Sequence, residues 1–172
     1  MKTKKRTKKI VLLALLVAIM VIFSRFISIE TEFLKFSFTF IPEAITGALF
    51  GPIWTPVATV AADFIGMWIA PKAQFFFGFT LNALITGVIY GYFLGKREVK
   101  WSNIAWAVIL NAVIVRLILT PIWLYMMYHM PLLAIMPVRI LKQCITVPLE
   151  IIALDLILRR LPLARWRKEI DG

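Results

Sequence analysis

The sequence predicts an all-α membrane protein, a bundle of six transmembrane helices with both termini in the cytoplasm. Of its 172 residues, 61% are hydrophobic, and the mean hydropathy of +0.86 is well above that of ordinary soluble domains. Apolar runs recur at intervals of roughly 20–30 residues, the length that a helix needs to cross a bilayer. We therefore expect one transmembrane domain over 10–161, between a basic leader (1–9) and a basic tail (162–172).

The net charge of +11 is concentrated beside the apolar runs. Fourteen of the twenty Lys and Arg residues lie in 1–9, 96–100 and 159–168. Cytoplasmic loops of membrane proteins carry such an excess of cations, whereas the opposite loops hold only Lys35 and Lys72. This asymmetry predicts that both termini are cytoplasmic, and it indicates that the charge does not serve nucleic-acid binding.

The first span is expected over 10–27, directly after the basic leader. No small-residue cleavage pattern follows it, so we expect the span to be retained. The polar connector 28–40 comes next, and its second half alternates as a short extended segment does.

Two helices are expected around the sequence "GPIWTP" (51–56), which predicts a tight turn. The helix before it is short, 42–50, and Pro42 suits its first turn. The helix after it covers 56–69, and the next helix, beyond "APKAQ", covers 75–94.

The second half of the chain predicts two long helices. The basic loop "GKREVK" leads to a helix over 103–128, and "HMP" turns the chain into a last helix over 132–161. Pro137 and Pro148 are expected to bend that last helix.

Several ionisable residues fall inside the expected spans, where a charge costs at least about 2.5–3.5 kcal/mol on insertion scales. In "PVRILKQ" (137–143), Arg139 and Lys142 share one sector of the helix with Gln143, Thr146 and Glu150. The other polar candidates at membrane depth are Arg25, Asp63, Asn82 and Arg116. Because cations outnumber carboxylates at this depth, we expect a cavity in the outer half of the bundle that receives a negatively charged group. The alternative is internal ion pairing, such as Arg116 with Asp63.

Aromatic residues gather at the same outer ends of the expected helices. They are Trp68, Phe75, Phe76 and Phe77 in the third and fourth helices, and Trp123, Tyr125 and Tyr128 in the fifth. One interpretation is the aromatic belt that membrane proteins place at the interface. The other is a set of flat walls which, together with the cations, would suit a planar anionic heterocycle.

Motifs of catalysis are missing from the sequence. It contains one histidine, His129, and no Gly-rich phosphate loop or nucleophile motif in a usable context. We therefore expect no metal centre, no cofactor and no enzymatic activity. Energy for any uphill transport would have to come from a partner or an ion gradient.

Three runs, 49–71, 75–96 and 119–150, carry a resemblance to a known family. They resemble the substrate-binding S components of energy-coupling factor (ECF) vitamin transporters, over about residues 10–160. "FGPIW" and "GFTLNA" are similar to S components in general, and "MPVRILKQ" followed by "PLE" resembles the folate-specific branch.

The resemblance implies a six-helix bundle in the bacterial plasma membrane that binds folate from outside and has no hydrolytic activity. It would dock onto a membrane coupling protein and two ATPases. In the family, small residues spaced four apart on the first helix form the docking face, and Ala14 and Ala18 match this pattern. Such spacing lets helix backbones approach closely in lipid.

On this reading Arg139 and Lys142 would meet the anionic and heteroatom-rich parts of folate. Asp63 or Asn82 would pair with the pterin edge, and the connector 28–40 would act as a lid. The stacking walls would be Trp68, Phe75, Phe76 and Phe77. The alternatives are an S component for riboflavin or thiamine, a membrane enzyme, or a small structural membrane protein. Thiamine is cationic, so the surplus of intramembrane cations argues against it.

Overall fold

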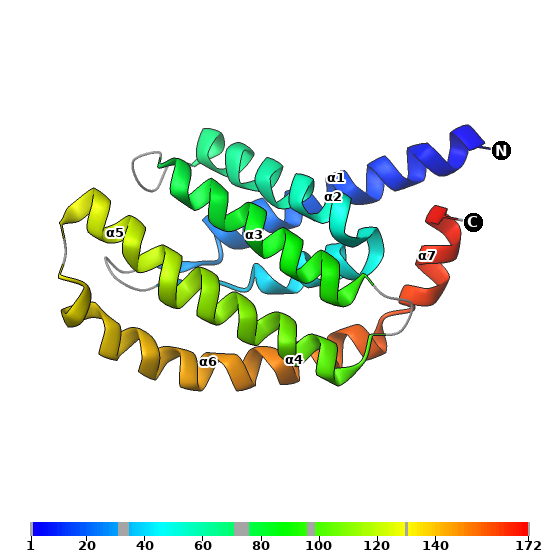
Figure 1. Cartoon of the computed structure of the whole chain (residues 1–172). Coiled ribbons are helices and arrows are strands. Elements are labelled where there is room, and N and C mark those ends of the chain that lie inside the picture. The colour runs from blue at the N-terminus through cyan, green and yellow to red at the C-terminus, as the bar shows by residue number, and fades with distance from the viewer. Residues whose placement is uncertain (1, 31–34, 71–75, 96–98, 130, 172) are drawn as a thin grey trace.

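The computed structural model describes residues 2–30, 35–70, 76–95, 99–129 and 131–171, and it is the helical bundle that the sequence predicts (Figure 1). A short antiparallel hairpin of β1 (Ile29–Glu30) and β2 (Lys35–Phe36) follows the first helix. The helices are α1 (Lys2–Arg25), α2 (Phe40–Ile69), α3 (Phe77–Leu94), α4 (Trp101–Leu110), the π-helix η1 (Asn111–Leu119), α5 (Thr120–Tyr128), α6 (Leu132–Arg160) and α7 (Leu163–Asp171).

The α2 segment consists of two helical limbs that meet at Gly51, whose φ of 71° and ψ of −167° are not helical. Figure 1 shows the two limbs running in opposite directions. The reversal lies beside the end of α3, because a Cβ added to Gly91 would lie 2.8 Å from the Gly51 carbonyl oxygen. The two predicted helices are therefore confirmed, but the predicted six-residue turn is wrong. Glycine makes the reversal at one position, and Pro52 already suits the first turn of the next limb.

Other boundaries differ from the predicted ones for simple reasons. The first helix begins at Lys2 instead of residue 10, since Lys and Arg are good helix formers outside the membrane too. The predicted helix 103–128 is one continuous rod, but its middle is the π-helix η1. The tail, for which no helix was predicted, forms α7.

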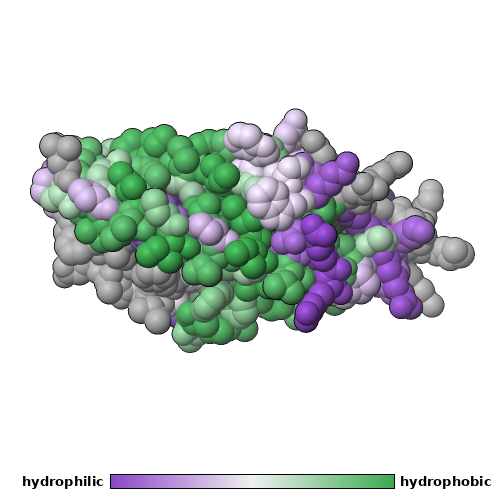
Figure 2. Space-filling model, turned by 90° about the horizontal axis from the view of Figure 1, so that it is seen from below, coloured by the Kyte–Doolittle hydropathy of each residue, from purple (hydrophilic) through white to green (hydrophobic). Residues whose placement is uncertain are grey.

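The outer surface of the bundle suits a membrane. Figure 2 shows a broad apolar side and a hydrophilic end, and both termini lie at one end in Figure 1. A long ion pair of 3.9 Å between Lys8 Nζ and Glu169 Oε2 joins the N-terminal part of α1 to α7 there. Within the part of the chain that the structure describes, four helical stretches are long and apolar enough to cross a membrane: Arg6–Arg25, Phe40–Ile69, Phe77–Leu94 and Trp101–Tyr128. The chain is thus a helical membrane protein, and the cytoplasmic location of its termini stays a prediction.

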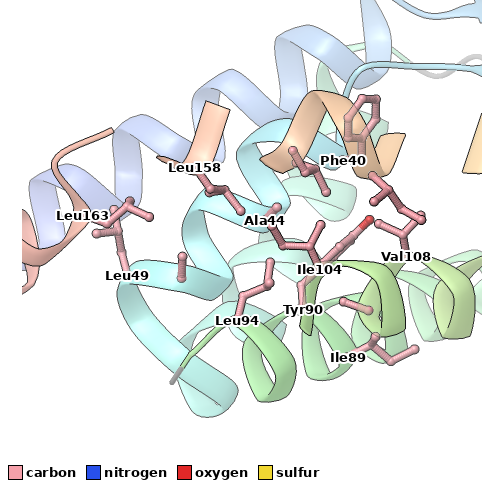
Figure 3. Packing of buried hydrophobic residues seen from close by; sticks show 14 of the residues in the cluster. Phe40, Ala44, Leu49, Ile89, Tyr90, Leu94, Ile104, Val108, Leu158 and Leu163 are labelled. Carbon is pink, nitrogen blue, oxygen red and sulfur yellow. The ribbon is translucent and has the colours of Figure 1, made fainter. Parts of the chain in front are cut away.

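The apolar core lies toward the end with the termini. Figure 3 shows side chains from the first limb of α2 meeting those of α3, α4 and the last turns of α6. Tyr90, Leu94, Ile104 and Leu154 are fully buried in this cluster. Leu163 of α7 joins it, so the amphipathic tail helix is part of the folded domain.

Close contact between α2 and α3 depends on glycine. A Cβ added to Gly47 would lie 2.7 Å from the carbonyl oxygen of Tyr90, and one added to Gly87 would lie 2.6 Å from the Cα atom of Pro56. In lipid, apolar side chains gain little by leaving the solvent, so helices associate through close packing between small residues. These glycines therefore set the distance between α2 and α3.

Arg167 of α7 caps the first limb of α2. That limb ends at Gly51, so the carbonyl of Ala48, in its last turn, has no helical donor. Arg167 Nε donates to that carbonyl at 2.6 Å, and its Nη2 donates to the carbonyl of Leu94, near the end of α3, at 3.0 Å. One guanidinium thus holds the α2 reversal, the end of α3 and the tail helix together.

Because the neighbour of Gly47 is backbone, which cannot move aside, we expect Gly47→Ala to lower the free energy of unfolding by about 1–3 kcal/mol. Gly66→Ala is the matched control, since an added Cβ there meets the flexible side chain of Arg25, 2.8 Å from its Nε. Thermal unfolding of both variants in detergent checks this. Equal losses of stability would mean that the α2–α3 distance is not fixed at Gly47.

Candidate ligand-binding site

The polar face of α6 points into the bundle, as its helical spacing predicts. Arg139, Gln143 and Glu150 are at most 9% exposed, and Lys142 and Thr146 are partly buried. The hydroxyl of Thr146 donates to the carbonyl of Lys142 at 2.9 Å and lies 3.2 Å from the side-chain oxygen of Gln143. Charged and amide groups are therefore presented to the interior along much of this helix.

Arg25 and Asp63 form an ion pair at the end of the bundle opposite the termini. Arg25 Nη2 lies 3.7 Å from Asp63 Oδ1, and the two side chains are 11% and 19% exposed. The hydroxyl of Thr80 donates to Asp63 Oδ2 at 3.0 Å. Gly66 leaves the space in which the Arg25 side chain crosses α2. Asp63 thus links α1, α2 and α3.

Asn82 holds the indole of Trp123 in place. Trp123 Nε1 donates to Asn82 Oδ1 at 3.0 Å, and Asn82 Nδ2 donates to the hydroxyl of Thr120 at 3.1 Å. The indole also packs against Phe76, with ring centroids 5.7 Å apart. A Cβ added to Gly78 would lie 2.6 Å from Trp123 Cδ2, so this glycine makes room for the aromatic pair.

The predicted aromatic residues lie in different surroundings. Trp68 is 94% exposed and Phe77 is 69% exposed, so both lie on the outer surface of this structure. Phe76 is partly buried against Trp123, and Phe75 lies outside the described residues. Of the predicted aromatic residues that the structure describes, Trp123 and Phe76 are therefore the pair that is partly buried.

A second ion pair lies in the middle of the span. Arg116 Nη1 donates to Glu150 Oε1 at 2.7 Å. The alternative predicted above, that Arg116 pairs with Asp63, is wrong in its partner, because Glu150 holds Arg116 while Arg25 holds Asp63. Sequence spacing could not reveal this, since each pair joins different helices.

Arg139 contacts the backbone of the helix that carries Arg116. Its Nη1 donates to the carbonyl oxygen of Arg116 at 3.3 Å. Lys142 lies one turn farther along α6 and is partly buried. Both cations lie on the face that carries Glu150, so they surround the same part of the interior.

These groups give the interior a net positive charge. Among the described residues at this depth, the cations are Arg25, Arg116, Arg139 and Lys142, and the carboxylates are Glu43, Asp63 and Glu150. Such a site suits an anionic ligand that also offers hydrogen-bonding edges and a flat ring. The described residues hold no group of three or more His, Cys, Asp or Glu side chains that could bind a metal ion.

Sequence reasoning missed Thr80 and Thr120, and it named Trp123 only as one of several aromatic residues, not as a partner of Asn82. Thr120 and Trp123 follow Arg116 by four and seven residues, which puts all three on one face of a regular helix. That spacing was the available signal. Thr80 carried none, because its role depends on the position of Asp63 on a neighbouring helix.

Comparisons with known proteins agree with this architecture. Residues 8–158 match the family described as "ECF transporter, substrate-specific component". The chain is 32% identical over 150 residues to the folate transporter FolT of Clostridium novyi, covering 87% of each chain. It is 33% identical over 154 residues to FolT of Leuconostoc mesenteroides, covering 86% of this chain and 83% of that one.

A solved structure is also similar. The crystal structure of FolT bound with folic acid superimposes with a TM-score of 0.86 and 45% sequence identity. The match covers 90% of this chain and 95% of that one.

Removing one member of the Arg116–Glu150 pair is expected to leave a buried charge without its partner. Arg116→Met should therefore lower the free energy of unfolding by about 3–5 kcal/mol. The double variant Arg116→Met with Glu150→Leu should regain most of that loss, because both charges are gone. Thermal unfolding of the single and double variants measures the difference. A double variant that loses as much as the sum of two single losses would contradict the pairing.

Proposed function

The chain belongs to the substrate-specific components of ECF transporters, and on that premise we propose that it binds folate within the bundle and passes it to a partner complex for import. The main support for the proposal is the structural and sequence similarity, over nearly the whole chain, to FolT bound with folic acid. The family is a transport component and not an enzyme. The chain is accordingly a multi-pass protein of the bacterial plasma membrane.

The chemistry of folate fits the polar interior. Folate has a flat pterin ring with N–H and amino groups at one edge, and a glutamate tail whose carboxylates are charged at neutral pH. The planar guanidinium of Arg139 can donate two parallel hydrogen bonds to a carboxylate, and Lys142 adds a point charge one turn away. These two cations are our proposed contacts for the anionic part of the ligand.

Other residues would recognise the ring. Asp63 and Asn82 carry the acceptor and amide groups that a pterin edge requires, and each is already oriented by a neighbouring hydroxyl. Trp123 and Phe76 supply the inward aromatic surface beside them. Arg25 and Arg116, which hold Asp63 and Glu150, would act by keeping those carboxylates in place.

The connector after α1 is proposed to cover the site. Its described part includes β1 and β2, whose partners are Ile29 with Phe36 and Glu30 with Lys35. The hydroxyl of Ser37 donates to the carbonyl of Phe23 at 3.2 Å, so the returning arm is tied to α1. A short hairpin tied in this way can move as a unit when ligand enters.

Docking on the coupling protein and its two ATPases is proposed through α1. Ala14 and Ala18 are both exposed on the outer face of this helix, and they lie one helical turn apart. Exposed small residues at this spacing allow another helix to approach closely in lipid. With the basic end of the bundle in the cytoplasm, this face is within reach of a membrane partner there.

We expect the purified protein, without ATP, to bind folate and to bind thiamine at least about 100-fold more weakly. The reason is that a cationic ligand would meet the positively charged interior without a compensating carboxylate, and unfavourable charge contacts cost several kcal/mol. Quenching of the fluorescence of its six tryptophans gives both affinities. Equal affinity for the two vitamins would refute the assignment of folate.

Replacing Ala14 or Ala18 with Trp should leave folate affinity unchanged, since neither side chain faces the interior. Uptake by the assembled transporter should fall roughly tenfold or more, because a bulky side chain prevents close approach of the partner helix. Leu15→Trp is the matched control, as Leu15 is exposed and already large. Normal uptake in both Ala variants would place the docking surface elsewhere.

A further inference from the structure

The fifth span changes its helical register in the middle of the membrane. From Asn111 to Leu119 it is a π-helix, the form in which N–H groups bond to the carbonyl five residues earlier. The last of these bonds runs from the N–H of Thr120 to the carbonyl of Val115. The hydroxyl of Thr120 donates to the same carbonyl at 2.6 Å.

Pro121 ends this register and leaves the carbonyl of Arg116 without a helical donor. In an α-helix that carbonyl would accept from residue 120, whose N–H already serves Val115. In a π-helix it would accept from residue 121, which is proline and has no N–H. Within a membrane no water replaces the missing donor, and a buried carbonyl without a partner is unfavourable.

Arg139 supplies the donor from the neighbouring helix. Its Nη1 lies 3.3 Å from the carbonyl oxygen of Arg116, and the residue is 9% exposed. At the other end of the bundle Arg167 likewise donates to a backbone carbonyl, that of Ala48, where the first limb of α2 ends at Gly51. The chain thus places an arginine twice at a carbonyl that lacks a helical donor.

The bond fixes α6 against α5 at a second point. Glu150, eleven residues after Arg139, accepts from the side chain of Arg116 at 2.7 Å. Eleven residues are about three helical turns, so both contacts lie on one face of α6. Arg116 therefore binds α6 with its carbonyl at one position and with its guanidinium at another.

We infer that Pro121 is a positioning residue for the ligand site, because the donor it removes from the helix fixes the guanidinium of Arg139. This rests on the proposed function, in which Arg139 contacts folate. A guanidinium carries five N–H donors in one plane, so one bond to a carbonyl still allows others to face a carboxylate. If a long side chain is already immobilised before the ligand binds, less conformational entropy of that side chain is lost on binding, and the affinity is higher.

The test is a double-mutant cycle with Pro121→Ala and Arg139→Ala. Alanine at 121 restores an N–H that can reach the Arg116 carbonyl, so that N–H competes with Arg139 for the carbonyl. We expect Pro121→Ala to weaken folate binding by about 3- to 10-fold. Arg139→Ala should weaken it roughly 30-fold or more, since a buried charged contact is lost. In the Arg139→Ala background, Pro121→Ala should have no further effect on affinity.

Thermal unfolding without folate tests the hydrogen bond separately. Arg139→Ala should lower Tm by about 2–4 °C in the parent chain, and by clearly less when residue 121 is alanine. Pro52→Ala is the matched control, because it makes the same substitution at the opposite end of the bundle, away from Arg139. It should leave folate affinity unchanged.

The possible results separate the inference from the proposed function. If Pro121→Ala weakens folate binding equally in the parent chain and in the Arg139→Ala variant, Pro121 acts only on the fold and the positioning role is refuted. Unchanged or tighter binding in Pro121→Ala also refutes it. If Arg139→Ala leaves folate affinity unchanged while the Tm values remain coupled, Arg139 is not a ligand contact and the positioning role fails. If the parent chain does not bind folate at all, the proposed function itself is wrong.

Discussion

The constraint on which the structure depends is that a backbone carbonyl inside a membrane must find its donor within the protein. Pro121 removes a donor from the fifth span and the first limb of α2 ends at Gly51, and in both places an arginine from a distant segment donates to the carbonyl left without a helical donor. Arg167 thereby joins the tail helix to the reversal of α2, and Arg139 joins α6 to the fifth span. Cations that look too costly for a membrane protein thus complete its backbone hydrogen bonding.

Close packing is the second requirement, because apolar side chains gain little from leaving lipid for one another. The first limb of α2 meets α3 at Gly47, the second limb meets it at Gly87, and Gly51 reverses the chain beside Gly91. This compact pair is the frame against which the other helices are placed. It also brings Asp63 into contact with Thr80, two residues before Asn82 on α3.

Intramembrane charges serve two purposes in this chain. Asp63 and Glu150 each accept a cation from another helix, so the buried carboxylates are held as pairs. Arg139 and Lys142 lie on the same face of α6 as Glu150, and they are our proposed contacts for an anionic ligand. On that proposal, stability and recognition draw on neighbouring residues of one polar face.

The sequence by itself determined the six helical segments, the separation of the basic end from the apolar spans, and the inward polar face of α6. These follow from local properties, namely hydropathy, charge placement and helical period. It could not determine that Asp63 binds Arg25 and that Arg116 binds Glu150, or that Trp123 faces inward while Trp68 lies on the surface. Only the tertiary structure decided these, because each depends on which helices lie side by side and on how each helix is rotated about its axis. Hydropathy does not fix that rotation, since it is nearly the same on every side of a helix surrounded by lipid.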